Sequence, residues 1–309
     1  MASVAMTRTK TASSTSTSPR NRRRQLAGFL FVLPCVLFVC CFFLIPLVFT
    51  GWMSLNNWTI FGETHFIGFE NYANLTKDNV FLSSFGFTTK YTLVVCPLIC
   101  LLGFMLALLM QQTRPGVGIF RTVFFLPVVI GLGSASYLWI WLYNDQSGAI
   151  NSLLLRLGLI HAPILWFNTA NMGLLAVVIM IIWKTSGFAM LLFLIGIQAI
   201  PAELYEAARV DGANYWMRLL RITVPLLRRT FALTLVLVVT GSYLAFDQFY
   251  IMTHGGPENQ TVTIVQRIYQ VAFIYFKLGY SASQAIILLI VLLVISLAQL
   301  FILRGSPTE

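Results

Sequence analysis

Long apolar runs dominate this chain, and short polar segments separate them. A helix that crosses the hydrocarbon core of a bilayer needs about 20 consecutive, mostly apolar residues. Six runs approach or exceed this length: residues 27–49, 88–110, 122–143, 172–194, 231–252 and 284–303. The pattern predicts an all-α membrane protein with six transmembrane helices, the first of them kinked at Pro34 and Pro46.

The composition supports a membrane location. The 309-residue chain is 58% hydrophobic and 10% charged, with a mean hydropathy of +0.82, and soluble domains do not reach such values. Residues 27–303 are predicted to form one transmembrane domain. Residues 1–26 are basic, and their Ser/Thr-rich first part has too few apolar side chains to fold, so a disordered N-terminus is predicted.

A secretory signal is the alternative for the first apolar run, because Arg22, Arg23 and Arg24 precede it. That run is longer than the apolar core of a signal and is not followed by a cleavage site of small residues. A retained first span is therefore favoured.

The placement of basic residues predicts the orientation in the membrane. Arginines concentrate in residues 1–26, in the segment after the second run and in the segment 195–229, and cytoplasmic loops carry such an excess. Six spans put both termini on one side, so the termini, the short tail 304–309 and the loop 195–229 are predicted to be cytoplasmic. The net charge of +10 reflects this bias, so lipid is an expected partner and nucleic acid is not.

The polar segment 201–225, between the fourth and fifth spans, predicts two short helices. Pro201 suits a helix start, and Asp211-Gly212 is a stop signal at which Gly212 is expected to be left-handed. Asn214 can cap a second helix through Arg221, and Pro225 cannot continue this helix without losing a backbone hydrogen bond.

This segment resembles the EAA loop of permease subunits from ATP-binding-cassette importers. The resemblance rests on Glu206-Ala207-Ala208, on Gly212 four residues later, and on Ile222 and Pro225; Val224 departs from the usual Leu. It implies cytoplasmic coupling helices that bind a separate ATPase, through Glu203, Tyr205, Glu206, Ala207, Ala208, Asp211, Gly212 and Pro225. The alternative is an ordinary helical hairpin with a surface pair of Glu206 and Arg209.

Other segments resemble the sugar permeases of these importers, in particular Arg114-Pro115-Gly116, the stretch 120–127 and Gly255-Gly256-Pro257. The resemblance implies a MetI-like transmembrane fold in the inner membrane of a bacterium and the first-subunit type of a heterodimer. The implied partners are a second permease subunit, a pair of ATP-binding subunits and an extracytoplasmic sugar-binding protein.

The chain carries no recognisable catalytic motif. Its three histidines lack metal-ligand spacing, and its five cysteines lie in predicted spans. Lys10-Thr11 and Lys184-Thr185 lack the glycines of a phosphate-binding loop. No catalytic residue, metal site or cofactor is therefore expected here, and the resemblance assigns ATP and Mg to the partner ATPase.

Polar residues inside the spans are the candidates for a substrate path, because ionisable groups are costly in a bilayer and usually face a wet cavity. Trp183, Gly187 and Met190 share one face of the fourth span, and Gly241 and Ser242 share one of the fifth. The predicted substrate-path residues are Trp183, Lys184, Ser186, Gly187, Met190, Gly241, Ser242, Tyr243 and Asp247. The alternative for Lys184 and Asp247 is a structural ion pair between two spans.

Other substrates and mechanisms remain open. A glycerol phosphate importer would favour a free Lys184, and a polyamine importer would favour more acids than Asp247. An ion-coupled secondary carrier would show an inverted repeat with broken spans in both halves, and no such repeat is found. In the segment 144–171, Ile150, Leu153, Leu154 and Leu157 predict a helix that lies in the membrane interface or packs on other spans.

Overall fold

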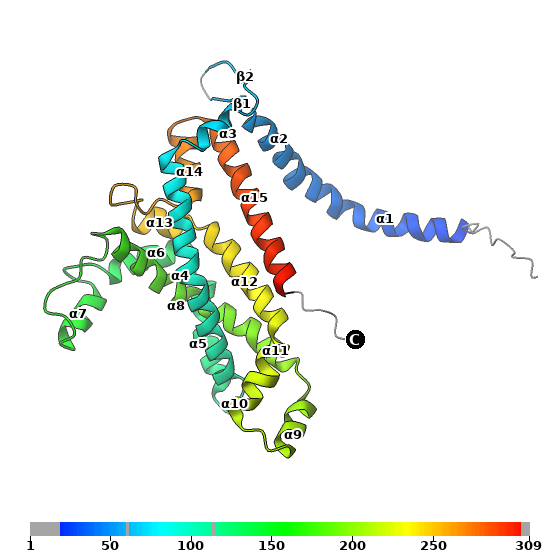
Figure 1. Ribbon diagram of the computed structural model, residues 1–309, viewed down its shortest axis with the longest axis vertical. Coiled ribbons are helices and arrows are strands. Elements are labelled where there is room, and N and C mark those ends of the chain that lie inside the picture. Colours follow the sequence, from blue (N-terminus) through cyan, green and yellow to red (C-terminus); the bar gives the residue numbers. More distant parts are fainter. Residues whose placement is uncertain (1–18, 60–61, 113–114, 304–309) are drawn as a thin grey trace, which may run out of the picture. The chain divides into compact units, whose positions relative to one another are not determined.

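The computed structural model describes residues 19–59, 62–112 and 115–303, and the described residues are mostly helical (Figure 1). The chain divides into two compact units, residues 1–52 and 53–309. Side chains are described from Gly28 to Phe301.

The first unit is helical, and from residue 28 onward the helix is apolar on all sides. It consists of α1 (Pro19–Val39), the π-helix η1 (Cys40–Leu44) and most of α2 (Ile45–Ser54). Residues 28–54 are long and apolar enough to cross a membrane. The departure from regular α-helix lies in η1 rather than at Pro34. Phe42 is part of η1, and its carbonyl would bond the N–H four residues later, which Pro46 lacks.

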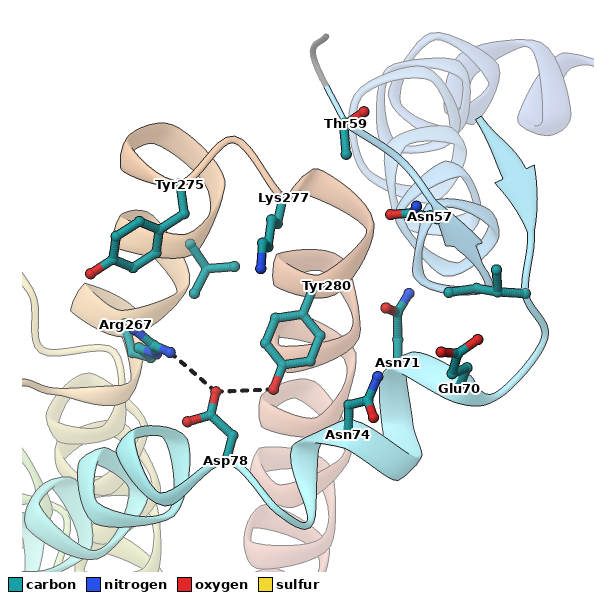
Figure 2. A pocket seen from close by; sticks show the side chains of 12 residues that line it. Asn57, Thr59, Glu70, Asn71, Asn74, Asp78, Arg267, Tyr275, Lys277 and Tyr280 are labelled. Atoms are coloured by element: carbon teal, nitrogen blue, oxygen red, sulfur yellow. Dashed lines mark hydrogen bonds and ion pairs between the residues drawn. The ribbon is translucent and has the colours of Figure 1, made fainter. Parts of the chain in front are cut away.

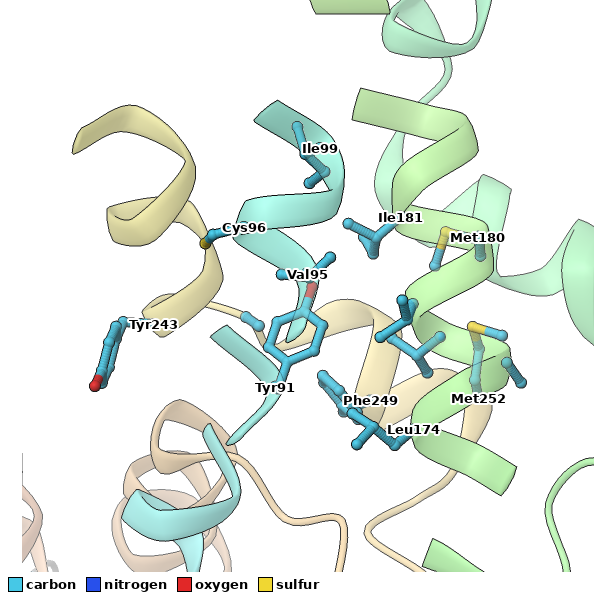
Figure 3. Packing of buried hydrophobic residues seen from close by; sticks show 14 of the residues in the cluster. Tyr91, Val95, Cys96, Ile99, Leu174, Met180, Ile181, Tyr243, Phe249 and Met252 are labelled. Carbon is cyan, nitrogen blue, oxygen red and sulfur yellow. The ribbon is translucent and has the colours of Figure 1, made fainter. Parts of the chain in front are cut away.

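The core of the second unit forms where α4 (Asn79–Met110) packs along α8 (Ala170–Gln198), next to α12 (Arg228–Tyr243) and α15 (Leu278–Leu303). Tyr91 and Val95 of α4 pack with Met180 and Phe249 in this core (Figure 3). A side chain at Gly103 would place its Cβ 2.5 Å from that of Ala189. The absence of a side chain there therefore allows the two long helices to approach closely.

The third and fifth predicted spans are not single straight helices, so the prediction of continuous helices was wrong there. A bend of 99° separates α5 (Val117–Val129) from α6 (Leu132–Leu142). In the fifth run α12 ends at Tyr243, and α13 (Asp247–Met252) follows after a break. The first break lies at Gly131, which is not helical and follows Pro127 by four residues. At the break between α12 and α13, the Thr263 hydroxyl donates a hydrogen bond to the carbonyl of Ala245.

By length and composition, four of the described helices could each cross a membrane. If each of the two bent helix pairs also forms a span, the number of spans rises to six. The second bent pair joins residues 215–226 to α12 at 62°. Helices α4, α8 and α15 extend beyond the predicted second, fourth and sixth spans, since their ends carry polar residues that the apolar pattern excluded.

Small elements lie at the two ends of α4 (Figure 1). One end carries the antiparallel pair β1 (Asn56–Asn57) and β2 (His65–Phe66), α3 (Glu70–Leu75), α14 (Ile264–Tyr269) and the π-helix η3 (Gln270–Ile274). The other end carries α9 (Ala202–Val210) and α10 (Tyr215–Arg218).

Helix α7 (Ala149–Arg156) lies in the segment expected to be interfacial or packed. Ile150 and Leu154 pack against the core, whereas Leu153 and Leu157 are exposed. The buried Asn151 bonds both the N–H and the carbonyl of Ile164. The helix therefore combines a packed face with an exposed apolar face.

Candidate functional site

A cavity of about 240 Å³ lies between α4, α8 and α12, within the apolar part of the second unit. Its polar lining consists of Tyr91, Lys184, Thr185, Ser242 and Gln248. The other lining residues are Ile99, Leu132, Ile181, Phe188, Leu237, Val238 and Gly241. Among these described lining residues Lys184 alone carries a formal charge.

The Lys184 ammonium binds the end of a broken helix. Its Nζ donates to the carbonyls of Pro127 and Val128, both at 3.4 Å, and to that of Ile130. The last carbonyls of a helix have no partners within the helix and carry a partial negative charge. Because lipid offers no donors, these carbonyls need a protein donor, and Lys184 supplies it.

The structure does not pair Lys184 with Asp247. Among the described side chains, the recorded carboxylate partners are Arg267 for Asp78 and His65 for Glu63. Asp247 is exposed at the first turn of α13, where a negative charge is favourable. The ion-pair alternative for these two residues is therefore not realised.

Gln248 brings a buried amide to the cavity. It is 2% exposed and lies beside the Tyr91 hydroxyl, while its Oε1 has no hydrogen-bond partner in the described part of the chain. The hydroxyls of Ser242 and Thr185 donate to carbonyls of their own helices, those of Val238 and Ile181. Because a buried polar atom without a partner is costly, Gln248 is the lining group with the most to gain from a ligand.

Three predicted substrate-path residues line this cavity: Lys184, Gly241 and Ser242. The other six lie elsewhere: Trp183 packs on Trp139, Ser186 and Met190 are buried, Gly187 abuts α5, Tyr243 bonds Thr89, and Asp247 is exposed. At Gly187 a Cβ would lie 2.1 Å from the Phe124 carbonyl oxygen, so this glycine permits close helix packing.

Sequence reasoning missed Tyr91 and Gln248. Gln248 had a signal, because it is an amide within the apolar run 231–252 and follows Asp247 directly. Tyr91 had none, since aromatic residues are frequent in these spans.

The predicted helix, glycine turn and helix between residues 201 and 218 are confirmed. Helix α9 ends at Val210, Gly212 is left-handed with φ +76°, and the Ala213 N–H donates to the Ala208 carbonyl at 2.8 Å. The Asn214 side chain accepts from the Met217 N–H at 2.8 Å. Each end of the turn is thereby capped.

The prediction that the second helix runs through Arg221 and does not continue at Pro225 was wrong. The chain stays helical through α10, the π-helix η2 (Leu219–Thr223) and α11 (Val224–Leu226), and bends before α12. In a regular α-helix the carbonyl of Arg221 would accept from the N–H of residue 225, which proline lacks. Arg221 lies in the wider π turn instead. Proline is thus accommodated within the helical path.

The two helices of this loop are joined and largely exposed. Tyr205 and Thr223 share a hydrogen bond of 3.0 Å between their hydroxyls. Next to it lies a cavity of about 370 Å³, into which Glu206, Arg209 and Arg218 project with Gln111 and Gln112 of the α4 end. Apolar side chains are also exposed, with Val210 at 89% and Trp216 at 67%.

A family model described as "Binding-protein-dependent transport system inner membrane component" matches residues 14–305. The chain belongs to this family. It is accordingly an inner-membrane permease of a transport system that depends on a binding protein.

Relatives and solved structures agree with this assignment. The trehalose/maltose transport system permease protein MalF of Thermococcus litoralis is 33% identical over 92% of this chain and 95% of its own. The sn-glycerol-3-phosphate transport system permease protein UgpA of Agrobacterium fabrum is 31% identical over 89% and 94%. A chain of a bacterial alginate ABC transporter crystallised with its alginate-bound periplasmic protein has a TM-score of 0.81 at 21% identity, covering 92% of this chain and 96% of its own, which shows a shared fold.

Proposed function

We propose that this permease forms half of the translocation pathway of an ATP-driven carbohydrate importer. The cavity beside Gln248 carries the proposal. Its free hydrogen-bonding capacity is that of a neutral amide, and its one charge, on Lys184, is already bound to carbonyl oxygens. A site of this kind suits a neutral solute rich in hydroxyl groups.

The other solutes fit this cavity less well. Glycerol phosphate is anionic and needs an available cation, but the Lys184 ammonium holds three carbonyls at the end of α5. A polyamine needs carboxylates, and none of the described lining residues is acidic. Identity alone does not separate these solutes, because relatives named for maltose and for glycerol phosphate are similarly close.

An ion-coupled carrier is disfavoured by the family rather than by the helix breaks. Two bent helix pairs are present, so broken spans do not distinguish the two mechanisms in this chain. Membership of the binding-protein-dependent family favours an importer driven by ATP, with the hydrolysis on partner subunits.

The loop of α9 and α10 is the proposed contact with the ATPase. The loop lies at one end of the long helices (Figure 1). Several large apolar side chains are exposed in it, namely Leu204, Val210, Tyr215 and Trp216, and exposed apolar side chains that gather in one region are typical of a protein interface. Glu203, Glu206 and Asp211 supply charge, while Gly212 and the bond between Tyr205 and Thr223 fix the angle between the helices. A second permease subunit is proposed to complete the pathway.

Uptake assays on cells that lack this gene test the substrate class. Maltose, trehalose, sn-glycerol 3-phosphate and putrescine serve as labelled probes, with the complemented strain as control, and other neutral saccharides extend the panel. We expect the cells that lack the gene to lose uptake of a neutral saccharide and the complemented strain to regain it. Loss of glycerol phosphate or putrescine uptake instead would contradict the carbohydrate assignment.

The energy source is tested on membrane vesicles that contain the complete transporter. Uptake is expected to require ATP and to continue when a protonophore collapses the ion gradients. Uptake that stops with the protonophore while ATP is present would identify an ion-coupled carrier.

A further inference from the structure

A large pocket of the second unit lies at the end of α4 opposite the loop of α9 and α10. It has a volume of about 700 Å³ and is lined from α3, α14, η3 and the start of α15. Figure 2 shows the side chains of Asn71, Asn74, Lys277 and Tyr280 around one hollow, with Arg267 and Asp78 at its edge. The predicted orientation places this outer pocket on the external side of the membrane.

We propose that the outer pocket binds a neutral saccharide before it reaches the membrane cavity. The proposal rests on the proposed carbohydrate function and adds a second site on the same route. Three properties of the pocket carry it: a balanced charge, free hydrogen-bonding groups and an aromatic surface.

The charges of the pocket cancel. Arg267 and Asp78 form an ion pair at 3.1 Å with both side chains largely buried, and the Tyr280 hydroxyl donates to the same carboxylate oxygen at 3.0 Å. Glu70 and Lys277 add one further charge of each sign. Two acids and two bases leave no net charge to attract an anion or a cation.

Several hydrogen-bonding groups face the pocket without a partner in the described part of the chain. The side chains of Glu70, Asn57, Asn74 and Lys277 make no recorded side-chain hydrogen bond. A carboxylate or an amide can engage two neighbouring hydroxyls at once, and an ammonium can donate to others. This mixture of donors and acceptors matches a polyol better than an apolar or singly charged ligand.

The pocket also has an aromatic wall. Tyr275 is exposed, and the Arg267 guanidinium lies 5.7 Å from its ring centroid. Pyranose rings present C–H groups that pack on aromatic rings, as apolar surfaces do in other small-molecule sites. Tyr275 can therefore contact the ring face of a sugar while the amides bind its hydroxyls.

The outer pocket and the membrane cavity share structural elements. Asp78 at the start of α4 and Tyr91 in the cavity are 13 residues apart in sequence, about 20 Å along a helix. The N–H of Ile264, at the start of α14, donates to the Thr88 hydroxyl of α4 at 2.9 Å. The neighbouring Thr263 bonds the chain break that precedes Gln248.

Saturation-transfer NMR on the purified permease–ATPase complex tests the outer pocket, without binding protein or nucleotide. The probe is the saccharide whose uptake is lost when the gene is deleted. We expect saturation transfer to this sugar with the wild-type complex and a drop of about fivefold or more for Asn74→Ala/Lys277→Ala, since each lost hydrogen bond weakens binding by about that factor. The matched variant Asn79→Ala/Lys77→Ala removes the same groups outside the pocket and is expected to keep the signal.

The outcomes separate this proposal from the carbohydrate function. Equal signals in the pocket variant and in the wild type, or no signal in either, would overturn the outer site while leaving the transport assignment intact. Signals that stay unchanged while stimulation of ATP hydrolysis by the binding protein is lost would instead identify a docking surface for that protein. If deletion of the gene removed uptake of no saccharide, the proposed function and the outer site would both fall.

Discussion

Replacement of Lys184 by methionine tests whether this lysine supports the broken span or binds substrate. Lys184→Met keeps the length of the side chain but removes the ammonium that donates to the carbonyls of Pro127, Val128 and Ile130. The two bonds at 3.4 Å are weak, so the main loss is the hydrogen bond to the Ile130 carbonyl. A carbonyl left unpaired in an apolar site costs about 1–3 kcal/mol.

The predicted effect is a loss of stability. At about 2 kcal/mol, the temperature of unfolding of the purified complex is expected to fall by a few degrees, because the shift per kcal/mol becomes smaller as the protein becomes larger. Thr185→Val is the matched control, because the Thr185 hydroxyl bonds only its own helix at Ile181 among the described residues. Asp247→Asn should lower the unfolding temperature much less than Lys184→Met, because it removes only an exposed charge at the first turn of α13 and no ion pair to Lys184.

Thermal unfolding followed by tryptophan fluorescence, together with the amount of protein in the membrane, measures this effect. A Lys184→Met complex that unfolds at the wild-type temperature and has lost transport would refute the helix-end role and would make Lys184 a substrate contact. If Asp247→Asn destabilised the complex as much as Lys184→Met does, the result would support an ion pair between Lys184 and Asp247.

Four further predictions concern single positions. Gly187→Ala should reduce protein levels, because the added Cβ would meet the Phe124 carbonyl. Gly241→Ala should be tolerated, because a Cβ there meets nothing within 4 Å. Immunoblotting of membranes compares the amounts of the two variants. Gly212→Ala should cost about 1 kcal/mol for a left-handed residue and leave protein levels intact while uptake falls, so full uptake would remove the coupling role. At Asp78, burial opposes ionisation, but hydrogen bonds from the Phe81 N–H, Arg267 and Tyr280 hold its pKa below 3.8. The stabilising contribution of the Asp78 carboxylate is thus present above about pH 4 and is lost as the pH falls through the lowered pKa. An Asp78→Asn variant as stable as the wild type at pH 7 would contradict this. A cysteine at Asn214 should react with a membrane-impermeant reagent in opened but not in intact cells, and labelling of intact cells would reverse the predicted orientation.

The capping and turn residues between 201 and 214 correctly predicted the helix, glycine turn and helix of this loop. Gly212 and Asn214 act through their own backbone and their nearest neighbours, so their conformations follow from local chemistry. Four of the six long apolar runs were also correctly located as helices without a sharp bend. At Gly212 and Asn214, local rules were sufficient because the partner of each group lies within a few residues.

Features that depend on distant contacts escaped prediction. The break near Gly131 is supported by Lys184, more than 50 residues away, and the break after Tyr243 by Thr263. Gly187 was expected in the substrate path from its helical face, but that face packs against α5. Pro225 was read as a helix end because a π turn cannot be recognised from proline alone.

Uptake by reconstituted vesicles with Gln248→Ala tests the membrane cavity most directly. The complete transporter is supplied with binding protein, labelled saccharide and ATP, and Gln198→Ala, an exposed amide at the end of α8, serves as the matched control. We expect Gln248→Ala to lower sugar uptake about fivefold or more at normal protein levels, because it removes the unpartnered amide oxygen of the cavity, while the control keeps wild-type uptake. Wild-type uptake by Gln248→Ala would contradict the cavity as the carbohydrate site.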